Sequence, residues 1–192
     1  MSETCDTLDL IQKRRSIRKF SAEPVTVDQI RTLAEAAEAA PSAMNQQPWR
    51  CHFITSPKVI GEINAAAFAK FRADGNQGVI DRLTARDSAE NIFYGAPLVV
   101  IITAERNQMT GYAMIDCGIV AQTIALAAES IGLGSCIIGL TAAAFSGLAR
   151  QSVGRLIQMP DSHEFAISIA IGHPLTSKEP HERLPERINI IS

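Results

Sequence analysis

The densest group of basic side chains in the sequence lies near its start, in the segment KRRSIRKF. Arg14, Arg15 and Arg18 bracket Ser16 at the end of a predicted helix. Guanidinium groups form planar, charge-assisted hydrogen bonds that match phosphate oxygens, and the Ser16 hydroxyl adds a further donor. Basic residues at a helix C-terminus are also often a solvated surface that complements the helix dipole. The spacing alone therefore leaves a phosphate site and an ordinary surface cluster open.

A second polar segment, PSAMNQQPW, places three amide side chains between two prolines and just before the only tryptophan. The prolines stiffen the loop and favour an extended backbone. Asn45, Gln46 and Gln47 carry both donors and acceptors, which suits the edge of a ring with alternating N–H and C=O groups. An ordinary polar turn is the alternative interpretation, and Trp49 is expected to pack in the core.

The run GLGSCIIG has the glycines of a phosphate-binding loop but not their spacing. It lacks the G-x-G-x-x-G pattern and the G-K-[ST] ending, and it enters a predicted strand rather than a helix. Its glycines are better explained as a cap for the preceding helix and as a close backbone approach near Gly139. The run is therefore weak evidence for a nucleotide site.

Cysteine and histidine spacing does not indicate a metal site. The four cysteines form no C-x-x-C pair, and the four histidines show neither H-x-x-x-H nor H-x-E spacing. Free, mostly buried thiols in a reducing compartment are expected instead. The formal net charge of −2, with acidic and basic residues interspersed, gives no reason to expect nucleic-acid or membrane partners. No signal-peptide core stands at the start, so we expect a cytoplasmic protein.

These residues must be positioned by helices and strands of a single domain, residues 1–192. A chain of 192 residues with 46% hydrophobic composition suits one globular domain. Hydrophobic periodicity and turn signals predict helices and strands whose irregular alternation favours the α+β class. The predicted helices are a first one with Leu8, Leu10 and Ile11 on its apolar face and Thr4 or Asp6 as its cap, one over 25–40 with Thr26 and Gln29 as a capping box, one over 112–134, and a short one near 145–153. The predicted strands are 50–55, 97–103, 134–140 and 165–172.

Three further segments carry expectations about assembly and access. Residues 58–90 are weakly helical, broken by two glycines and rich in charge, which predicts a mobile cover. The alanine-rich segment 112–134 contains Asp116 and Glu129, which favours a buried core or subunit-interface helix over a membrane span. The final run INIIS, within the trailing arm 186–192, reads as a strand that pairs either at an edge of its own sheet or with another subunit.

In this order along the chain, RRSIRKF, APSAMNQQPW, AESIGLGSCIIG, IGHP and ERLP closely resemble the nitroreductase family. The resemblance covers nearly the whole chain, and RRSxR followed by PSxxNxQPW is its most specific part. It implies a nitroreductase-like central mixed, mainly antiparallel sheet flanked by helices. It also implies a homodimer with two FMN sites at the subunit interface and a C-terminal arm that reaches the partner subunit.

The resemblance further implies which residues contact FMN. The first segment, which holds the phosphate and ribityl and touches the pyrimidine side of the ring, matches Arg14, Arg15, Ser16 and Arg18. The loop that passes along the flavin, largely from the partner subunit, matches Pro41, Ser42, Ala43, Asn45 and Gln47. The strand segment near the ring, whose backbone N–H is a candidate donor toward N5, matches Ile137, Ile138 and Gly139. A phosphate-contacting arginine of the tail matches Arg183, and His181 stands where the family often has lysine.

The implied function is an FMN-dependent oxidoreductase that works by a ping-pong cycle. Hydride passes from NADH or NADPH to flavin N5, and electrons then pass to a small acceptor such as a nitroaromatic or a quinone. No catalytic side chain is needed, and Cys136 is expected to be a packed thiol. The alternatives are dehalogenation, flavin breakdown or azoline oxidation on the same scaffold, a non-enzymatic flavin carrier or redox sensor, and an interaction domain whose arginines bind another anion.

Overall fold

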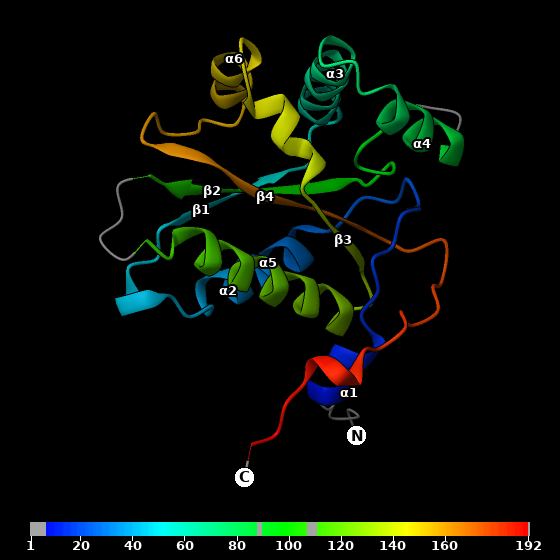
Figure 1. The fold of residues 1–192 in the computed structure, drawn as a ribbon, viewed down its shortest axis with the longest axis vertical. Helices are drawn as coiled ribbons and strands as arrows, with labels where there is room; N and C mark the ends of the chain where they lie inside the picture. The colour runs from blue at the N-terminus through cyan, green and yellow to red at the C-terminus, as the bar shows by residue number, and fades with distance from the viewer. Residues whose placement is uncertain (1–6, 88–89, 107–110, 192) are drawn as a thin grey trace.

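A computed structural model describes residues 7–87, 90–106 and 111–191 and shows a central sheet with helices on both faces (Figure 1). The sheet has the strand order β1-β2-β4-β3, and every neighbouring pair is antiparallel. The strands are β1 (Trp49–Ile54), β2 (Leu98–Glu105), β3 (Gly134–Ile138) and β4 (His163–Gly172). A parallel contact is made by an isolated bridge between Ser16 and Ser135 beside β3. The predicted α+β class and mainly antiparallel sheet are confirmed.

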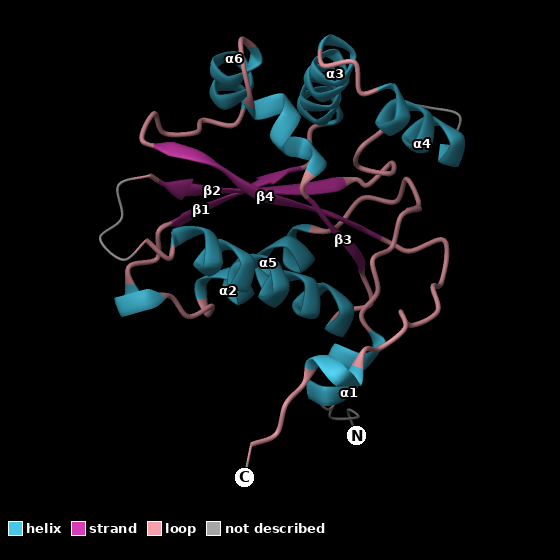
Figure 2. Cartoon of the chain, in the orientation of Figure 1, coloured by secondary structure: helices cyan, strands magenta, loops and turns pink. Residues whose placement is uncertain are grey.

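The helices form two layers, one on each face of the sheet (Figure 2). One layer holds α3, α4, α6 and the 3-10 helix η2; the other holds α2 and α5, with α1 beyond them. The helices are α1 (Thr7–Lys13), α2 (Val27–Glu38), α3 (Pro57–Ala73), α4 (Gln77–Asp87), α5 (Ala113–Ser130) and α6 (Ala149–Leu156), and the 3-10 helices are η1 (Ala43–Asn45), η2 (Leu140–Phe145) and η3 (Pro185–Arg187).

Strand β2 lies inside the sheet and is buried on both of its faces. Its apolar run is continuous, and all its residues except the last are buried. Alternate side chains point to opposite faces of a strand. Val99 and Ile101 therefore join the core under α3 and η2, whereas Val100 and Ile102 join the core under α2 and α5. One uninterrupted apolar segment thus supplies the centre of both cores, as its sequence predicted.

The predicted capping box at the start of α2 is confirmed. The Thr26 hydroxyl accepts a hydrogen bond from the Gln29 N–H at 3.2 Å, and the Gln29 side chain accepts one from the Thr26 N–H at 2.9 Å. The proposed caps of the first helix, Thr4 and Asp6, lie outside the described residues. Helix α1 buries none of its residues, and Leu8 is 62% exposed.

The expectation of a weakly helical, mobile cover over 58–90 is wrong for α3. This helix has 17 residues and buries Ile63, Ala67, Phe68 and Phe71 in the core. Gly75 adopts φ +70° directly after the helix, so it forms the turn to α4 instead of weakening a helix interior. The charged residues Lys58, Glu62 and Arg72 of α3 are exposed, so they occupy its outward face.

Helix α5 packs one side on the sheet and leaves part of its surface exposed. Val120 and Ile124 are fully buried, whereas Met114 and Ile115 are 49% and 61% exposed. Among the described helices, α5 has the length and mean hydropathy of a membrane span, a property that core helices of soluble proteins share. The packing of its buried side on the sheet agrees with the predicted core or interface helix.

The INIIS run does not pair with the sheet of its own chain. Residues 188–191 have no strand partner and stay exposed; Ser192 lies outside the described residues. Ile190 and Ile191 are each 93% exposed. Pairing at an edge of its own sheet, one of the two sequence interpretations, is therefore wrong for residues 188–191.

We predict that Phe68→Ala lowers the free energy of unfolding by about 3–5 kcal/mol, the usual cost of removing a buried aromatic ring. Phe68 is 1% exposed and packs edge-to-face on Phe71 with ring centroids 5.7 Å apart. Urea denaturation at fixed protein concentration measures the effect. Leu148→Ala, at a fully exposed position, is the control and should change the free energy by less than about 0.5 kcal/mol. A small loss in Phe68→Ala would mean that α3 is not part of the core.

Candidate functional site

The arginine segment 14–18 is fixed along the edge strand β3. The Ile17 N–H donates to the Ser135 carbonyl at 2.9 Å, and the Leu175 N–H donates to the Lys19 carbonyl at 3.0 Å. The segment therefore lies between β3 and the chain that follows β4. A Cβ atom on Gly134 would lie 3.0 Å from the Ile17 side chain, so a larger residue here would require that side chain to shift.

The sequence predicted two roles for the glycines of GLGSCIIG, a cap for the preceding helix and a close backbone approach near Gly139. Gly132 adopts φ +77° just after α5, which confirms its role in ending that helix. A Cβ at Gly139 would meet no atom of the chain closer than 4.0 Å, so the close backbone approach expected there is not made by the chain itself and stays a prediction. Other parts of the chain approach closely at Gly134 and at Gly172. A Cβ at Gly172 would lie 2.6 Å from Pro97.

Arg14 carries a buried donor without a partner. Its Nε is inaccessible to solvent and makes no hydrogen bond. Arg15 is held by backbone carbonyls, with Nη1 donating to Gln12 at 2.5 Å and Nε donating to Lys178 at 3.1 Å. None of Arg14, Arg15 and Arg18 pairs with a carboxylate within the described ranges. A buried, unpaired guanidinium nitrogen is costly. The segment therefore fits an anion better than it fits a solvated surface.

A cavity of about 300 Å³ joins the arginine segment to the end of β3. Arg18 lies in its wall together with the predicted strand residues Ile137, Ile138 and Gly139. Arg18 also borders a neighbouring hollow of about 370 Å³, formed by residues 16–19 and 176–178. The structure thus brings Arg18 of the first predicted segment together with the third segment, although more than a hundred residues separate them.

Two residues in the wall of the same cavity were not predicted from the sequence. Arg82 comes from α4, and Tyr94 comes from the turn before β2. The Arg18 guanidinium lies over the Tyr94 ring, 5.9 Å from its centroid, a cation–π contact that orients the arginine. Neither residue has a spacing relationship to the arginine segment, so no local sequence signal could have found them.

The loop 41–47 lies at the other side of the chain from the arginine segment (Figure 1). Three non-glycine residues in it, Met44, Asn45 and Gln47, have φ values of 52°, 53° and 45°. Such left-handed conformations cost on the order of 1–3 kcal/mol each and cluster at functional sites. The single chain does not bring this loop to the cavity. The expected contribution of the loop from a partner subunit stays a prediction.

The C-terminal tail runs beside the arginine segment, and its predicted phosphate contacts stay a prediction. The Arg15–Lys178 hydrogen bond ties the start of the tail to that segment. His181 and Arg183 are exposed and make no hydrogen bond or ion pair with the rest of the described chain.

Three cysteines and one histidine are wholly or partly buried. Burial raises the pKa of the Cys51 and Cys117 thiols to about 12. Cys136 is 1% exposed, in agreement with the packed thiol that was expected. Burial, with Arg50 nearby, lowers the pKa of His52 to about 4, so this histidine is neutral near pH 7. Within the part of the chain that is described, no cluster of His, Cys, Asp and Glu could hold a metal ion.

The chain belongs to the nitroreductase family, whose sequence profile matches residues 11–173. An NADPH-flavin oxidoreductase from Vibrio harveyi is 30% identical over an alignment that covers 95% of this chain and 72% of the relative. A nitrobenzene nitroreductase from Ectopseudomonas oleovorans is 31% identical, with 67% of this chain and 71% of the relative covered. The family assignment made from the sequence motifs is confirmed.

Solved structures show the same fold at full length. A nitroreductase with bound FMN from Desulfitobacterium hafniense is 34% identical, has a TM-score of 0.91, and is matched over 97% of this chain and 98% of that one. An iodotyrosine deiodinase bound to FMN and 3-iodo-L-tyrosine is 21% identical with a TM-score of 0.72. At that identity the second likeness shows a shared fold alone.

Proposed function

We propose that this chain is an FMN-dependent NAD(P)H oxidoreductase that reduces a small acceptor such as a nitroaromatic or a quinone. The observation that carries the proposal is the buried, unpaired Nε of Arg14 in a segment whose arginines have no carboxylate partner in the described chain. This donor set fits the phosphate of FMN. The descriptions of the Vibrio harveyi relative and of the FMN-bound Desulfitobacterium hafniense structure support the same cofactor.

Charged side chains of the arginine segment and the backbone at the end of β3 would bind different parts of FMN. Arg14 and Ser16 would hold the phosphate and ribityl, together with Arg183 of the tail. The backbone of residues 137–139 would lie against the ring, where Gly139 leaves the approach free of a side chain. Bound FMN would supply the redox chemistry between the nicotinamide and the acceptor.

Arg18 and Arg82 would act on the charge that develops during reduction. Both guanidiniums line the cavity, and Tyr94 fixes the direction of Arg18. Preorganised positive groups stabilise negative charge that forms in the transition state, because they need no reorganisation at that moment. With Cys136 buried and no metal cluster among the described residues, the protein's role is binding, orientation and electrostatics.

We also propose that the working form is a homodimer. The apolar residues Leu8 and Ile11 of α1 and Met114 and Ile115 of α5 are exposed, and so is the terminal run 188–191. Exposed apolar side chains of this kind are candidate interaction sites in soluble proteins. A second copy would cover these faces and bring its loop 41–47 to the cavity, completing the three predicted contact segments. The cytoplasmic location and the lack of nucleic-acid or membrane partners stay predictions.

The function is tested by an anaerobic absorbance scan of the purified protein before and after addition of NADH or NADPH. We expect a flavin spectrum that bleaches with at least one nicotinamide and returns when a nitroaromatic or quinone is added. The donor that bleaches the flavin identifies the nicotinamide preference. A flavin that stays oxidised would instead indicate a carrier, a sensor or specialised flavin chemistry, and a colourless protein that FMN cannot reconstitute would refute the proposal.

Removal of the Arg14 guanidinium should weaken FMN binding. We predict that Arg14→Ala costs about 1.5–3 kcal/mol of FMN binding free energy, the range for a hydrogen bond to a charged group, or about 10- to 150-fold in Kd. Flavin fluorescence quenching on titration of the apoprotein measures the Kd. Arg31→Ala is the matched control, because Arg31 is an exposed arginine of α2 that pairs with Asp28. Equal Kd values for the two variants would remove Arg14 from the site.

A charge on the exposed face of α5 should disrupt the dimer. We predict that Ile115→Glu, at a 61% exposed position, shifts sedimentation from dimer toward monomer, because assembly would bury the new carboxylate. FMN affinity should fall in parallel, since the partner's loop would be lost. Leu148→Glu, fully exposed between η2 and α6, is the control and should remain dimeric. A dimer with unchanged affinity in Ile115→Glu would place the interface elsewhere.

A further inference from the structure

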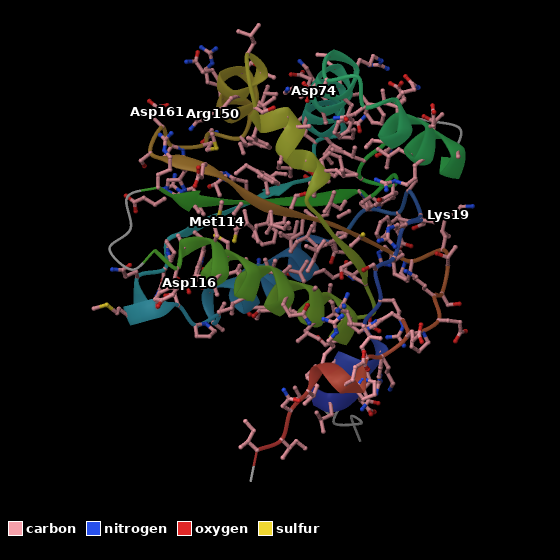
Figure 3. All side chains as sticks on the ribbon, in the orientation of Figure 1. Lys19, Asp74, Met114, Asp116, Arg150 and Asp161 are labelled. Carbon is pink, nitrogen blue, oxygen red and sulfur yellow. The ribbon has the colours of Figure 1, made fainter. Side chains whose placement is uncertain are left out.

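A buried carboxylate links α5 to the loop 41–47. Asp116 lies in the first turn of α5 and is 3% exposed (Figure 3). Its Oδ1 accepts a hydrogen bond from the Ala43 N–H at 3.2 Å, across 73 positions of sequence. A carboxylate taken out of water is unfavourable unless hydrogen bonds replace its hydration. The single contact to Ala43, together with the dipole at the start of the helix, replaces part of that hydration.

The second oxygen of Asp116 has no donor. Oδ2 is inaccessible to solvent and makes no hydrogen bond within the described chain. The residues beside it in sequence, Tyr112, Met114 and Ile115, are 55%, 49% and 61% exposed. Asp116 therefore lies in the same helical turn as Met114 and Ile115, two exposed residues that were assigned above to the dimer interface. A donor for Oδ2 can come from a subunit that covers this surface.

The loop that Asp116 contacts is strained and needs external support. Met44 and Asn45 are left-handed without being glycines. Inside the loop, the Gln47 N–H donates to the Ser42 hydroxyl at 2.9 Å and the Gln47 side chain donates to Asn45 at 2.9 Å. These contacts close the turn locally, but they do not attach it to the domain. The Asp116–Ala43 hydrogen bond makes that attachment at the start of η1.

We propose that Asp116 is a positioning residue that couples dimer assembly to flavin binding. Oδ1 holds the strained loop in the conformation that reaches the partner's flavin, and Oδ2 accepts a hydrogen bond from the partner subunit. Formation of the interface thus strengthens the same carboxylate that orders the loop. The inference rests on the proposed flavin function and dimer. It adds Asp116 as the residue through which dimer assembly affects flavin binding.

The two oxygens can be tested separately with two substitutions. Asp116→Ala removes both acceptors. Asp116→Asn keeps a carbonyl oxygen for the Ala43 N–H but places an NH₂ group where a donor from the partner would arrive. Glu129→Gln, a half-buried carboxylate near the other end of α5, is the control for loss of charge on this helix.

Three quantities are measured for each variant: hydrogen exchange of the loop 41–47 amides without FMN, the dimer dissociation constant, and the FMN Kd at a fixed fraction of dimer. Asp116→Ala should speed exchange at Ala43 and raise the FMN Kd, each by about tenfold or more, the effect of losing one charge-assisted hydrogen bond. Asp116→Asn should keep loop protection near the wild-type level while the dimer constant rises about tenfold. Glu129→Gln should leave all three within about twofold of wild type, the range of a surface substitution.

Each outcome decides a different part of the inference. Unchanged exchange and FMN Kd in a folded Asp116→Ala protein would overturn the positioning role. An unchanged dimer constant in Asp116→Asn would overturn the partner donor to Oδ2. If Asp116→Ala does not fold, the Asp116→Asn measurements decide alone, and loss of loop protection with an intact dimer would refute the division of roles. A wild-type protein that binds no FMN would refute the proposed function, while the exchange and dimer arms still report on Asp116.

Discussion

The hydrogen bond from the Ile17 N–H to the Ser135 carbonyl is the contact on which the arrangement of the site depends. It fixes the arginine segment against β3, at an edge of the sheet where the strand has no further neighbour. The approach is close, since a Cβ at position 134 would lie 3.0 Å from the Ile17 side chain. Once the backbone lies there, the Arg14 guanidinium is partly enclosed without a counterion and Arg18 is directed toward the end of β3. A local packing requirement thus produces a site for an anion.

The two long apolar segments, β2 and α5, determine how the sheet is covered on its two faces. Strand β2 is buried on both faces, so the sheet needs a helical layer above it and another below it. Helix α3 with η2 supplies one layer, and α2 with α5 supplies the other. Because α5 covers the sheet with only one side, its other side stays apolar and exposed. The same helix therefore serves the core and leaves an exposed apolar surface, which the proposed second copy of the chain would cover.

Conformational strain and buried charge are found together at the other end of the molecule. The left-handed residues of the loop 41–47 lie beside Asp116, whose second oxygen has no donor in the described chain. Arg14 and Asp116 thus each have a buried polar atom without a partner in the described chain, one on each side of the fold. When two subunits associate, one side of each subunit can complete the site on the opposite side of the other. The proposed flavin site, shared across an interface, requires this arrangement.

The sequence by itself determined the features that depend on neighbouring residues: the Thr26–Gln29 capping box, the helix end at Gly132, the doubly buried strand β2, and the motifs that identify the family. Tertiary structure decided what depends on residues far apart. Charge in α3 suggested a mobile cover because one-dimensional composition does not show which face is buried, and INIIS suggested a strand because β-propensity does not supply a partner. Arg82, Tyr94 and Asp116 acquire their positions only through packing, since hydrogen bonds and cavities form between atoms that meet in space regardless of their separation along the chain.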